Sequence, residues 1–346
     1  YARGGGYRYP ISVALRNSTV SGNSAKRGAG IVAYDYVTLD VADSTIVENV
    51  ARKRGGGLLL SGVSFTAIVG STVSYNSAAA GGGVFGEFYA NLEVVDTTVA
   101  GNEARRGAGG GIFSCYHLDF YLERSRVTGN TARRGGGIFA GNGYGDTIVR
   151  YSTISGNSAR RQGGGAFFEA GGDGGVDIRL TNTTVSGNSA QTGGGIFESL
   201  RYYRHESRIR HATITNNTAA VGAGVYFDNV AAYNHVLDGN VIAGNPGGNC
   251  AGSGFADEGG NFDDDGSCPG SSAVTPGVDF DVALADNGGP TETHALLEGS
   301  VAVDTGGDCL LPTDQRGFPR DADCDAGAFE LGAEPPPASR RERLEP

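Results

Sequence analysis

The feature that most constrains this chain is a repeat, seen clearly in STISGNSARRQGGGAFF from Ser152 to Phe168. Copies of this unit with a few substitutions begin at Ser18, Ser125, Thr183 and Ala212. A fixed period of this size is typical of a solenoid, in which each unit stacks on the previous one. The asparagine of each copy recurs at intervals of 26 to 31 residues, at Asn23, Asn49, Asn76, Asn102, Asn130, Asn157, Asn188, Asn217 and Asn245.

The T-[VI]-x-x-N part of the unit favours a strand, because β-branched residues suit extended backbone and alternate side chains point to opposite faces. If coils stack as parallel strands about 4.8 Å apart, each asparagine lies above the previous one. Its amide can then pass hydrogen bonds along the stack as a ladder. The apolar residue of the motif should form one buried column, made of Val20, Ile46, Val73, Val99, Val127, Ile154, Val185, Ile214 and Ile242.

Glycine content decides between a β-solenoid and a helical repeat. The chain holds 60 glycines, and each would cost a helix interior roughly 1 kcal/mol. Triplets such as Gly135 to Gly137 instead suit sharp turns and close backbone approach. They precede an apolar pair such as Ile138-Phe139, of which only one member can face the interior, and the pattern does not say which. We therefore predict an all-β, right-handed parallel β-helix of about nine to eleven coils of about 27 residues.

Basic residues gather at one point of the unit, just before the glycines. Stacking would align them into a basic ridge, which is either a surface for an anionic polysaccharide, phosphate or acidic partner or a solvated turn that aids solubility. An acidic chain of net charge -11 without a basic domain is not expected to bind nucleic acid. The ridge comprises Lys26, Arg27, Arg52, Lys53, Arg54, Arg105, Arg106, Arg133, Arg134, Arg160 and Arg161.

An enzyme acting on polysaccharides would need carboxylates, or calcium and a base, close together on successive coils. At the position before the S-T-V motif the acids are Asp43 and Asp96, two coils or about 10 Å apart. The five histidines lack zinc-ligand spacing, and the chain has neither a nucleophile elbow nor a P-loop. We therefore predict no catalytic residue and no bound cofactor.

Beyond Asn245 the composition changes. Residues 1–245 contain 22 basic against 18 acidic residues, whereas 246–346 contain 5 against 20. We divide the chain into β-helix repeats (1–245), acidic coils and a cap over the C-terminal end of the solenoid (246–331), and a tail rich in proline and charge (332–346). A basic body with an acidic end suggests a head-to-tail contact that does not close.

Four of the five cysteines lie in the acidic residues 246–346. An even number of cysteines in a loop-rich region with the character of a secreted protein indicates disulfides. Of three possible connectivities we expect the local pairs, Cys250 with Cys268 and Cys309 with Cys324. Cys115 is left over as a thiol expected to be buried.

The run Asp263-Asp264-Asp265-Gly266 has the oxygen density that calcium prefers, but not the rest of an EF-hand loop. Asp263 and Asp265 are thus candidate calcium ligands.

The repeats resemble those of polymorphic outer-membrane proteins and autotransporter adhesins. The end of the chain, with ADNGGPTETHALLEGSVAVDTG (285–306), TDQRGFPR (313–320) and CDAGAFEL (324–331), together with GGNFDDDGSC (259–268), resembles the choice-of-anchor Q domain proteins. That resemblance implies a secreted bacterial β-helix with a surface anchor, and it implies no reaction. No hydrophobic tail follows these motifs.

These features predict a secreted, extracellular or cell-surface structural protein that assembles end to end with copies of itself into filaments. The alternatives are an adhesin that binds surface polysaccharide and, behind it, a polysaccharide-active enzyme. No stretch of 18 apolar residues is present, so no transmembrane helix is predicted.

Overall fold

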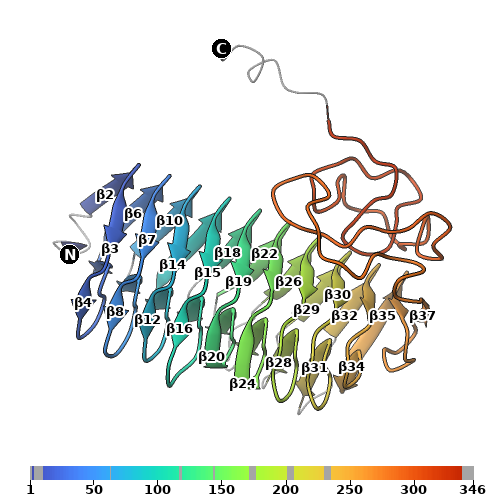
Figure 1. Cartoon of the computed structure of the whole chain (residues 1–346), viewed down its shortest axis with the longest axis horizontal. Helices are drawn as coiled ribbons and strands as arrows, with labels where there is room; N and C mark the ends of the chain where they lie inside the picture. The colour runs from blue at the N-terminus through green and yellow to red at the C-terminus, as the bar shows by residue number, and fades with distance from the viewer. Residues whose placement is uncertain are drawn as a thin grey trace.

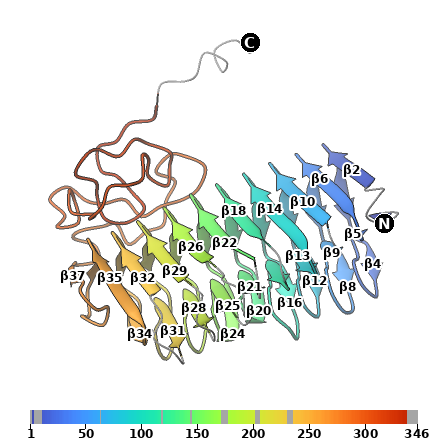
Figure 2. The same ribbon diagram turned by 180° about the vertical axis from the view of Figure 1, so that it is seen from behind.

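The computed structural model describes residues 2–3, 11–62, 64–116, 119–142, 145–170, 177–200, 206–229 and 235–336. Within them the chain is all-β and contains no helix, and so no helix able to span a membrane. The strands form a parallel β-helix, a long rod that Figures 1 and 2 show from opposite sides. The end of the predicted tail, residues 337–346, lies outside the described residues.

Each coil contributes one strand to each of two ten-stranded parallel sheets. Sheet A consists of β1 (Ala2–Arg3), β5 (Ile31–Tyr34), β9 (Leu58–Ser61), β13 (Val84–Glu87), β17 (Ile112–Cys115), β21 (Ile138–Asn142), β25 (Ala166–Ala170), β28 (Ile196–Leu200), β31 (Val225–Asn229) and β34 (Cys250–Gly252). Sheet B consists of β2 (Ile11–Arg16), β6 (Val37–Ala42), β10 (Ser64–Val69), β14 (Ala90–Val95), β18 (Phe120–Glu123), β22 (Thr147–Arg150), β26 (Asp177–Thr181), β29 (Glu206–Arg210), β32 (His235–Asp238) and β35 (Phe255–Gly259).

Two further sheets close the coils. Sheet C consists of β3 (Thr19–Ser21), β7 (Thr45–Val47), β11 (Thr72–Ser74), β15 (Thr98–Ala100), β19 (Arg126–Thr128), β23 (Thr153–Ser155), β27 (Thr184–Ser186), β30 (Thr213–Thr215), β33 (Val241–Ala243), β36 (Phe262–Asp263) and β37 (Ser272–Ala273). Sheet D consists of β4 (Ser24–Ala25), β8 (Val50–Ala51), β12 (Ser77–Ala78), β16 (Glu103–Ala104), β20 (Thr131–Arg134) and β24 (Ser158–Gln162).

The repeats stack in register, so equivalent residues pair from coil to coil. In sheet C, for example, Val99 pairs with Val127 and Val127 with Ile154. From Ile46 to Ile242 every residue of this column is buried in one continuous apolar core, and Val20 packs against it partly buried. The coils are therefore held mainly by burial of like side chains on one another.

An asparagine ladder runs beside this core. The side chain of Asn130 accepts bonds from the backbone and side-chain amides of Asn102, at 2.9 and 3.0 Å, and donates to Asn157 at 2.9 Å and to the Val99 carbonyl at 2.9 Å. The same pattern links Asn23 through successive coils to Asn245. Each amide thereby satisfies backbone groups that the turn after sheet C leaves unpaired.

The glycine turn fits this ladder because the coils approach closely there. A Cβ added to Gly136 would lie 2.4 Å from the Gly164 carbonyl oxygen, and one added to Gly137 would lie 3.0 Å from the Asn157 side chain. No side chain fits in that space.

The apolar pair after the glycines divides between two environments. Ile138 points into the core, whereas Phe139 joins an outer column in which neighbouring rings are nearly parallel, with centroids 5.0 Å from Phe113 and 5.1 Å from Phe167. Offset stacking of this kind adds to the apolar burial of each ring. The column runs through Phe85, Phe113, Phe139, Phe167, Phe197 and Tyr226.

Residues 274–336 form loops with isolated bridges, which we call the C-terminal segment. We expected residues 246–331 to form irregular last coils and a cap over the C-terminal end of the solenoid. Strands β34 to β37 do continue the coils, whereas the C-terminal segment lies beside the last coils, over the outer face of sheet C (Figure 1). The reason is that β33 presents Val241 and Ala243 outward, where they pack with apolar residues of the segment that include Phe280 and Phe329.

The two expected disulfides are present. Cys250 is bonded to Cys268 in the last coils, and Cys309 to Cys324 within the C-terminal segment. Both pairs are local, and each restrains a stretch that lacks the repeat.

Candidate functional site

The basic ridge lies mainly at the turn after sheet D, and only β20 and β24 carry ridge arginines within the strand itself. In β20 the inward Ala132 separates two exposed residues, Thr131 and Arg133, so alternation along the strand directs this arginine to solvent. Backbone bonds from Arg52 to Ala25 and from Arg105 to Ala78 keep successive coils aligned here. The cations of the ridge therefore recur near the same turn, although the register does not place them directly on one another: Arg54 pairs with Ala80, and Arg134 pairs with Ala108 and Gln162.

Most of the ridge lacks counter-charges. Within the described part of the chain, no carboxylate forms an ion pair with Arg106, Arg133, Arg160 or Arg161. Of these, Arg133 and Arg160 lie on the neighbouring strands β20 and β24, where like charges repel and so destabilise the free protein. Arg54 differs because it pairs with Glu87 at 2.7 Å.

The ridge lacks a basic residue in the coil of Ala79, and an arginine of the next coil supplies a charge at that place. The Arg105 guanidinium reaches back to donate to Ser77 Oγ at 2.6 Å and to the Ala51 carbonyl at 2.7 Å. Its charge thus lies over the coil of Ala79, and the side chain spans two coils.

A row of small polar side chains runs parallel to the cations on sheet D. Ser77 pairs with Glu103, Glu103 with Thr131, and Thr131 with Ser158. The row continues with a bridge from Ser158 to Ser189. A hollow of about 250 Å³ follows it, lined by Glu103, Ala104, Thr131, Ala132, Ser158 and Arg160. We call this row the hydroxyl row; Glu103 is its acidic member.

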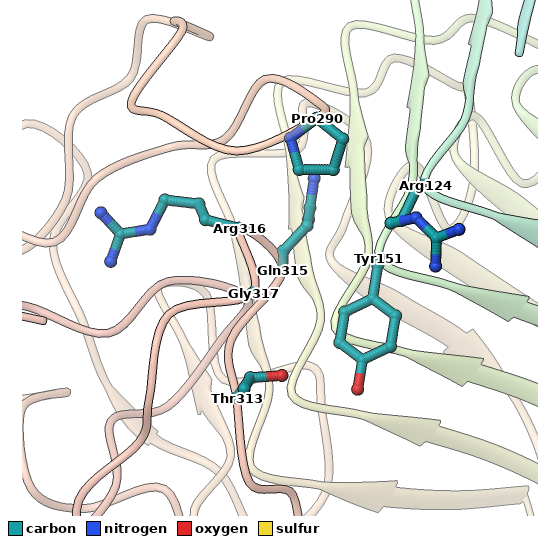
Figure 3. A pocket seen from close by; sticks show the side chains of 7 residues that line it. All are labelled: Arg124, Tyr151, Pro290, Thr313, Gln315, Arg316 and Gly317. Atoms are coloured by element: carbon teal, nitrogen blue, oxygen red, sulfur yellow. The ribbon is translucent and has the colours of Figure 1, made fainter. Parts of the chain in front are cut away.

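A second candidate site is the seam between the solenoid and the C-terminal segment. Figure 3 shows Arg124 and Tyr151 on the solenoid side, facing the segment across a cavity of about 240 Å³. Another cavity of about 240 Å³ borders Leu311 of the segment and is lined on the solenoid by Arg179, Thr181, Arg208 and Arg210.

The arginines of the seam differ from those of the ridge, because acids already pair with them. Arg124 binds both carboxylate oxygens of Asp96, at 2.8 and 2.9 Å. Arg210 lies 3.0 Å from Asp238 and 3.0 Å from Glu258. Because Asp96 already binds two donor groups of Arg124, these donors are not available for bidentate binding of a ligand carboxylate.

Two titratable groups near the seam are strongly perturbed. Burial raises the pKa of Asp238 to about 6, although Arg210 opposes the shift, and one carboxylate oxygen of Asp238 is buried without a hydrogen bond. Burial lowers the pKa of His211 to about 4, with Arg320 adding to the effect. Both side chains lie beneath the C-terminal segment and out of contact with solvent.

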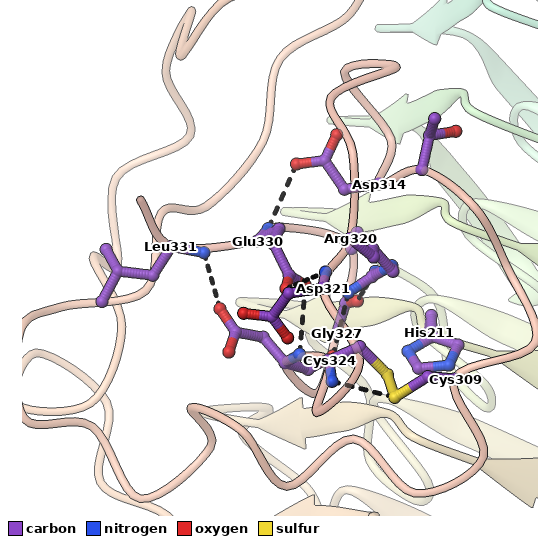
Figure 4. Close-up of polar contacts among 12 residues, drawn as sticks. His211, Cys309, Asp314, Arg320, Asp321, Cys324, Gly327, Glu330 and Leu331 are labelled. Atoms are coloured by element: carbon purple, nitrogen blue, oxygen red, sulfur yellow. Dashed lines mark hydrogen bonds and ion pairs between the residues drawn. A yellow bond between two sulfur atoms is a disulfide. The ribbon is translucent and has the colours of Figure 1, made fainter. Parts of the chain in front are cut away.

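The terminal motifs hold the segment to the solenoid. Buried Gln315 donates to Thr153 and Thr291, at 3.0 and 2.9 Å, and accepts from Thr184 at 2.7 Å. In Figure 4, Arg320 reaches Glu330 at 2.8 Å and the Gly327 carbonyl at 2.7 Å.

Arg320 also donates to the Asn182 side chain of the solenoid, at 3.0 Å. The side chains that make the TDQRGFPR and CDAGAFEL motifs conspicuous therefore dock this segment.

The aspartates predicted to bind calcium accept hydrogen bonds from backbone amides of the turn that they form. Asp263 accepts the Cys268 amide at 2.9 Å, and Asp265 accepts the amides of Ser267 and Asn249 at 3.0 Å. Asp264 accepts the Asn249 side chain and so ends the asparagine ladder. Calcium at Asp263 and Asp265 stays a prediction; in the described residues no three His, Cys, Asp or Glu side chains gather to hold a metal ion.

Two features escaped the sequence reasoning. One is a fully buried polar group inside the solenoid, in which Glu198 accepts from Ser207 at 2.9 Å and contacts His235 at 3.0 Å. The other is the seam, whose two sides lie far apart in sequence.

Cys115 is half-buried, and burial raises the pKa of its thiol to about 12, which keeps it unreactive.

A family model described as the right-handed β-helix region matches residues 7–190, more than half of the chain. The chain therefore belongs to the right-handed β-helix family. No curated protein and no solved structure matches it significantly.

Proposed function

We propose that this protein is an extracellular, non-enzymatic β-helix that binds an anionic polysaccharide along its basic ridge. The β-helix fold is compatible with surface proteins, adhesins and polysaccharide-active enzymes. The observation that carries the proposal is the group of cations without carboxylate partners beside sheet D, among them Arg133 and Arg160 on the neighbouring strands β20 and β24. Like charges this close repel, and an anionic ligand would relieve that repulsion, so the arrangement favours binding over a merely solvated turn.

The seam supports this choice by contrast. Its arginines are neutralised by acids of the same face, and its perturbed carboxyl group, Asp238, is covered by the C-terminal segment. A general acid needs to reach its substrate. The non-enzymatic part of the proposal rests on that geometry.

Neutralising the ridge tests the proposal. We expect the variant R133Q/R160Q to lose about two- to thirtyfold in affinity for an acidic polysaccharide, because each screened surface contact contributes about 0.2–1 kcal/mol. The matched control is R16Q/R150Q, which removes two arginines that pair with Asp40 and Glu123 on sheet B. Equal losses in both variants, or binding unchanged in the ridge variant, would refute the ridge as the site.

End-to-end assembly into filaments is the second proposal. The strands β34 and β35 are the last of sheets A and B, and among the described residues no further strand pairs with either of them; an unpaired strand edge can pair with another chain. The acidic C-terminal segment lies beside the rod rather than at its end, so charge complementarity between ends contributes less than expected. Electron microscopy distinguishes the outcomes: single rods at all concentrations would contradict assembly.

Secretion to the cell surface is supported by the two disulfides and by the resemblance to choice-of-anchor Q domain proteins. Fractionation of the native cells, with mass spectrometry of the cysteines, tests it. Cytosolic protein with four free thiols in the acidic region would contradict it.

A further inference from the structure

One loop of the C-terminal segment forms part of the wall of both seam cavities. The stretch 309–324, which we call the docking loop, is closed by a disulfide between its first and last residues (Figure 4). Leu311 borders one cavity, and Thr313 with residues 315–317 lines the other (Figure 3). Access to either cavity therefore depends on the position of this loop.

The docking loop is held against the solenoid by polar contacts spread along its length. The Thr313 carbonyl accepts from the Asn182 side chain at 2.7 Å, and Arg320 donates to the same side chain at 3.0 Å. Between them, Gln315 donates to the Thr153 hydroxyl at 3.0 Å. Because these contacts come from distant positions of the loop, they form together only while the loop keeps its closed shape.

The rest of the C-terminal segment is anchored without the docking loop. Apolar residues on both sides of the loop, among them Ala302 and Ala326, pack in one cluster with Val241 of the solenoid. The docking loop can therefore open while the residues before and after it stay in place.

The disulfide restrains the shape of this loop. Closing a loop of about 15 residues with a disulfide favours the closed form by up to roughly a hundredfold, because it removes conformations of the open chain. The effect is smaller here, since the Gly306 amide also donates to the Cys324 carbonyl at 2.8 Å and holds the loop ends together. We expect loss of the disulfide to favour the open loop by about three- to thirtyfold.

The two disulfides of the chain differ in their access to solvent. Cys250 and Cys268 are 5% and 4% exposed. Cys324 is fully buried, whereas Cys309 is half-buried. Thiol–disulfide exchange begins when a thiolate reaches one of the two sulfur atoms. A reductant should therefore attack the disulfide of the docking loop first, at Cys309.

We propose that the Cys309–Cys324 disulfide is a thiol-sensitive latch, and that its reduction by a dithiol releases the docking loop and opens both seam cavities. This proposal does not depend on glycan binding by the basic ridge.

The reaction is two successive exchanges. A thiolate of the dithiol attacks the Cys309 sulfur, the bond to Cys324 breaks, and Cys324 leaves as a thiolate that takes up a proton. The second thiol of the reductant then attacks the mixed disulfide, so Cys309 is released and protonated and the reductant leaves as a cyclic disulfide. The protein gains two electrons and two protons, and the dithiol is oxidised by the same amount.

Titration of the full chain with dithiothreitol at neutral pH tests the selectivity. After each addition, free thiols are alkylated and the labelled cysteines are identified by peptide mass spectrometry. Cys309 and Cys324 should be labelled at least about tenfold faster than Cys250 and Cys268, because a sulfur must be reached before it exchanges. Equal rates for the two pairs would overturn the latch.

Hydrogen exchange, measured on the reduced chain before alkylation, tests the release. The Gln315 amide donates to the Ala328 carbonyl and the Arg320 amide to the Pro312 carbonyl. Both should exchange about three- to thirtyfold faster after reduction. The Thr184 amide, which donates to Ser152 within the solenoid, is the internal control and should not change.

Paired cysteine variants separate the latch from general stabilisation. C309S/C324S should reproduce the fast exchange of the docking loop without reductant. The matched control C250S/C268S removes the other disulfide and should leave that exchange within about twofold of the native chain. If a variant fails to fold, as circular dichroism shows, the dithiothreitol titration of the native chain still decides.

Two further results would contradict the proposal. Protection of Gln315 and Arg320 that persists after full reduction of Cys309 and Cys324 would show that the disulfide does not control the loop. Loss of the β-sheet signal at the same dithiothreitol concentration would show that the bond stabilises the whole fold and is not a local latch.

Discussion

Replacing one asparagine in the middle of the ladder tests how the coils are held together. In Asn130→Ala, the backbone amide and one side-chain N–H of Asn102 lose their shared acceptor, which lies 2.9 and 3.0 Å away. Both donors are buried, and a buried donor left unpaired costs about 1–3 kcal/mol. The variant should therefore lose about 2–6 kcal/mol of unfolding free energy.

Asn23→Ala is the matched control, since Asn23 begins the ladder and is exposed to solvent. It donates to Asn49 Oδ1 and to the Ser21 carbonyl, and water can replace both bonds. Its loss should stay below about 1 kcal/mol.

Denaturant unfolding at equilibrium measures both variants, and hydrogen exchange at the Asn102 amide gives a local readout. Protection of that amide should fall in Asn130→Ala and not in Asn23→Ala. If the two variants shift the unfolding midpoint equally, or if the Asn102 amide keeps its protection, the ladder does not stabilise the rod as argued.

Three further predictions concern other parts of the molecule. Phe139→Ala should cost about 3–5 kcal/mol in denaturant unfolding, because the ring is buried and stacked on both sides; a loss below about 1 kcal/mol would contradict the column's importance. The pKa of Asp238 is raised from 3.8 to about 6, so the folded state binds the extra proton and this group's contribution falls as pH rises through that window. Asp238→Asn should remove that part of the pH dependence, measured as unfolding midpoints at about pH 4 and about pH 7, and an unchanged profile would count against it. Gln315→Leu should free the C-terminal segment, seen as faster limited proteolysis between 274 and 336 while the solenoid persists; equal cleavage rates would show that Gln315 does not dock it.

The repeat predicts the body of the fold because each unit is placed by the units next to it. Once strands stack in parallel, the column from Ile46 to Ile242 must share one face. The sequence does not show which side chain of the pair Ile138-Phe139 faces the interior, since both are apolar. The structure resolves it by enclosing Phe139 beside the turn, where the rings of Phe113 and Phe167 stack on its two faces.

The candidate sites were less accessible from the sequence. The ridge is visible as basic residues before glycines, but the reach of Arg105 over two coils depends on side-chain direction, which no pattern gives. The seam joins Tyr151 to residues near Gln315, and a segment without repeats offers no register from which to place it. The aspartates after Phe262 have the composition of a calcium loop, yet here they accept backbone amides.

The way the C-terminal segment returns to the solenoid has a consequence for biogenesis. The bond between Gln315 and Thr153 joins residues separated by 162 positions, whereas most contacts in the rod join neighbouring coils. The early coils can fold as soon as they leave the ribosome or a membrane pore, each templated by its predecessor. The last coils gain their contacts with the C-terminal segment only after that segment has been synthesised. Truncation near the C-terminus should therefore leave the first coils folded and the last coils less stable.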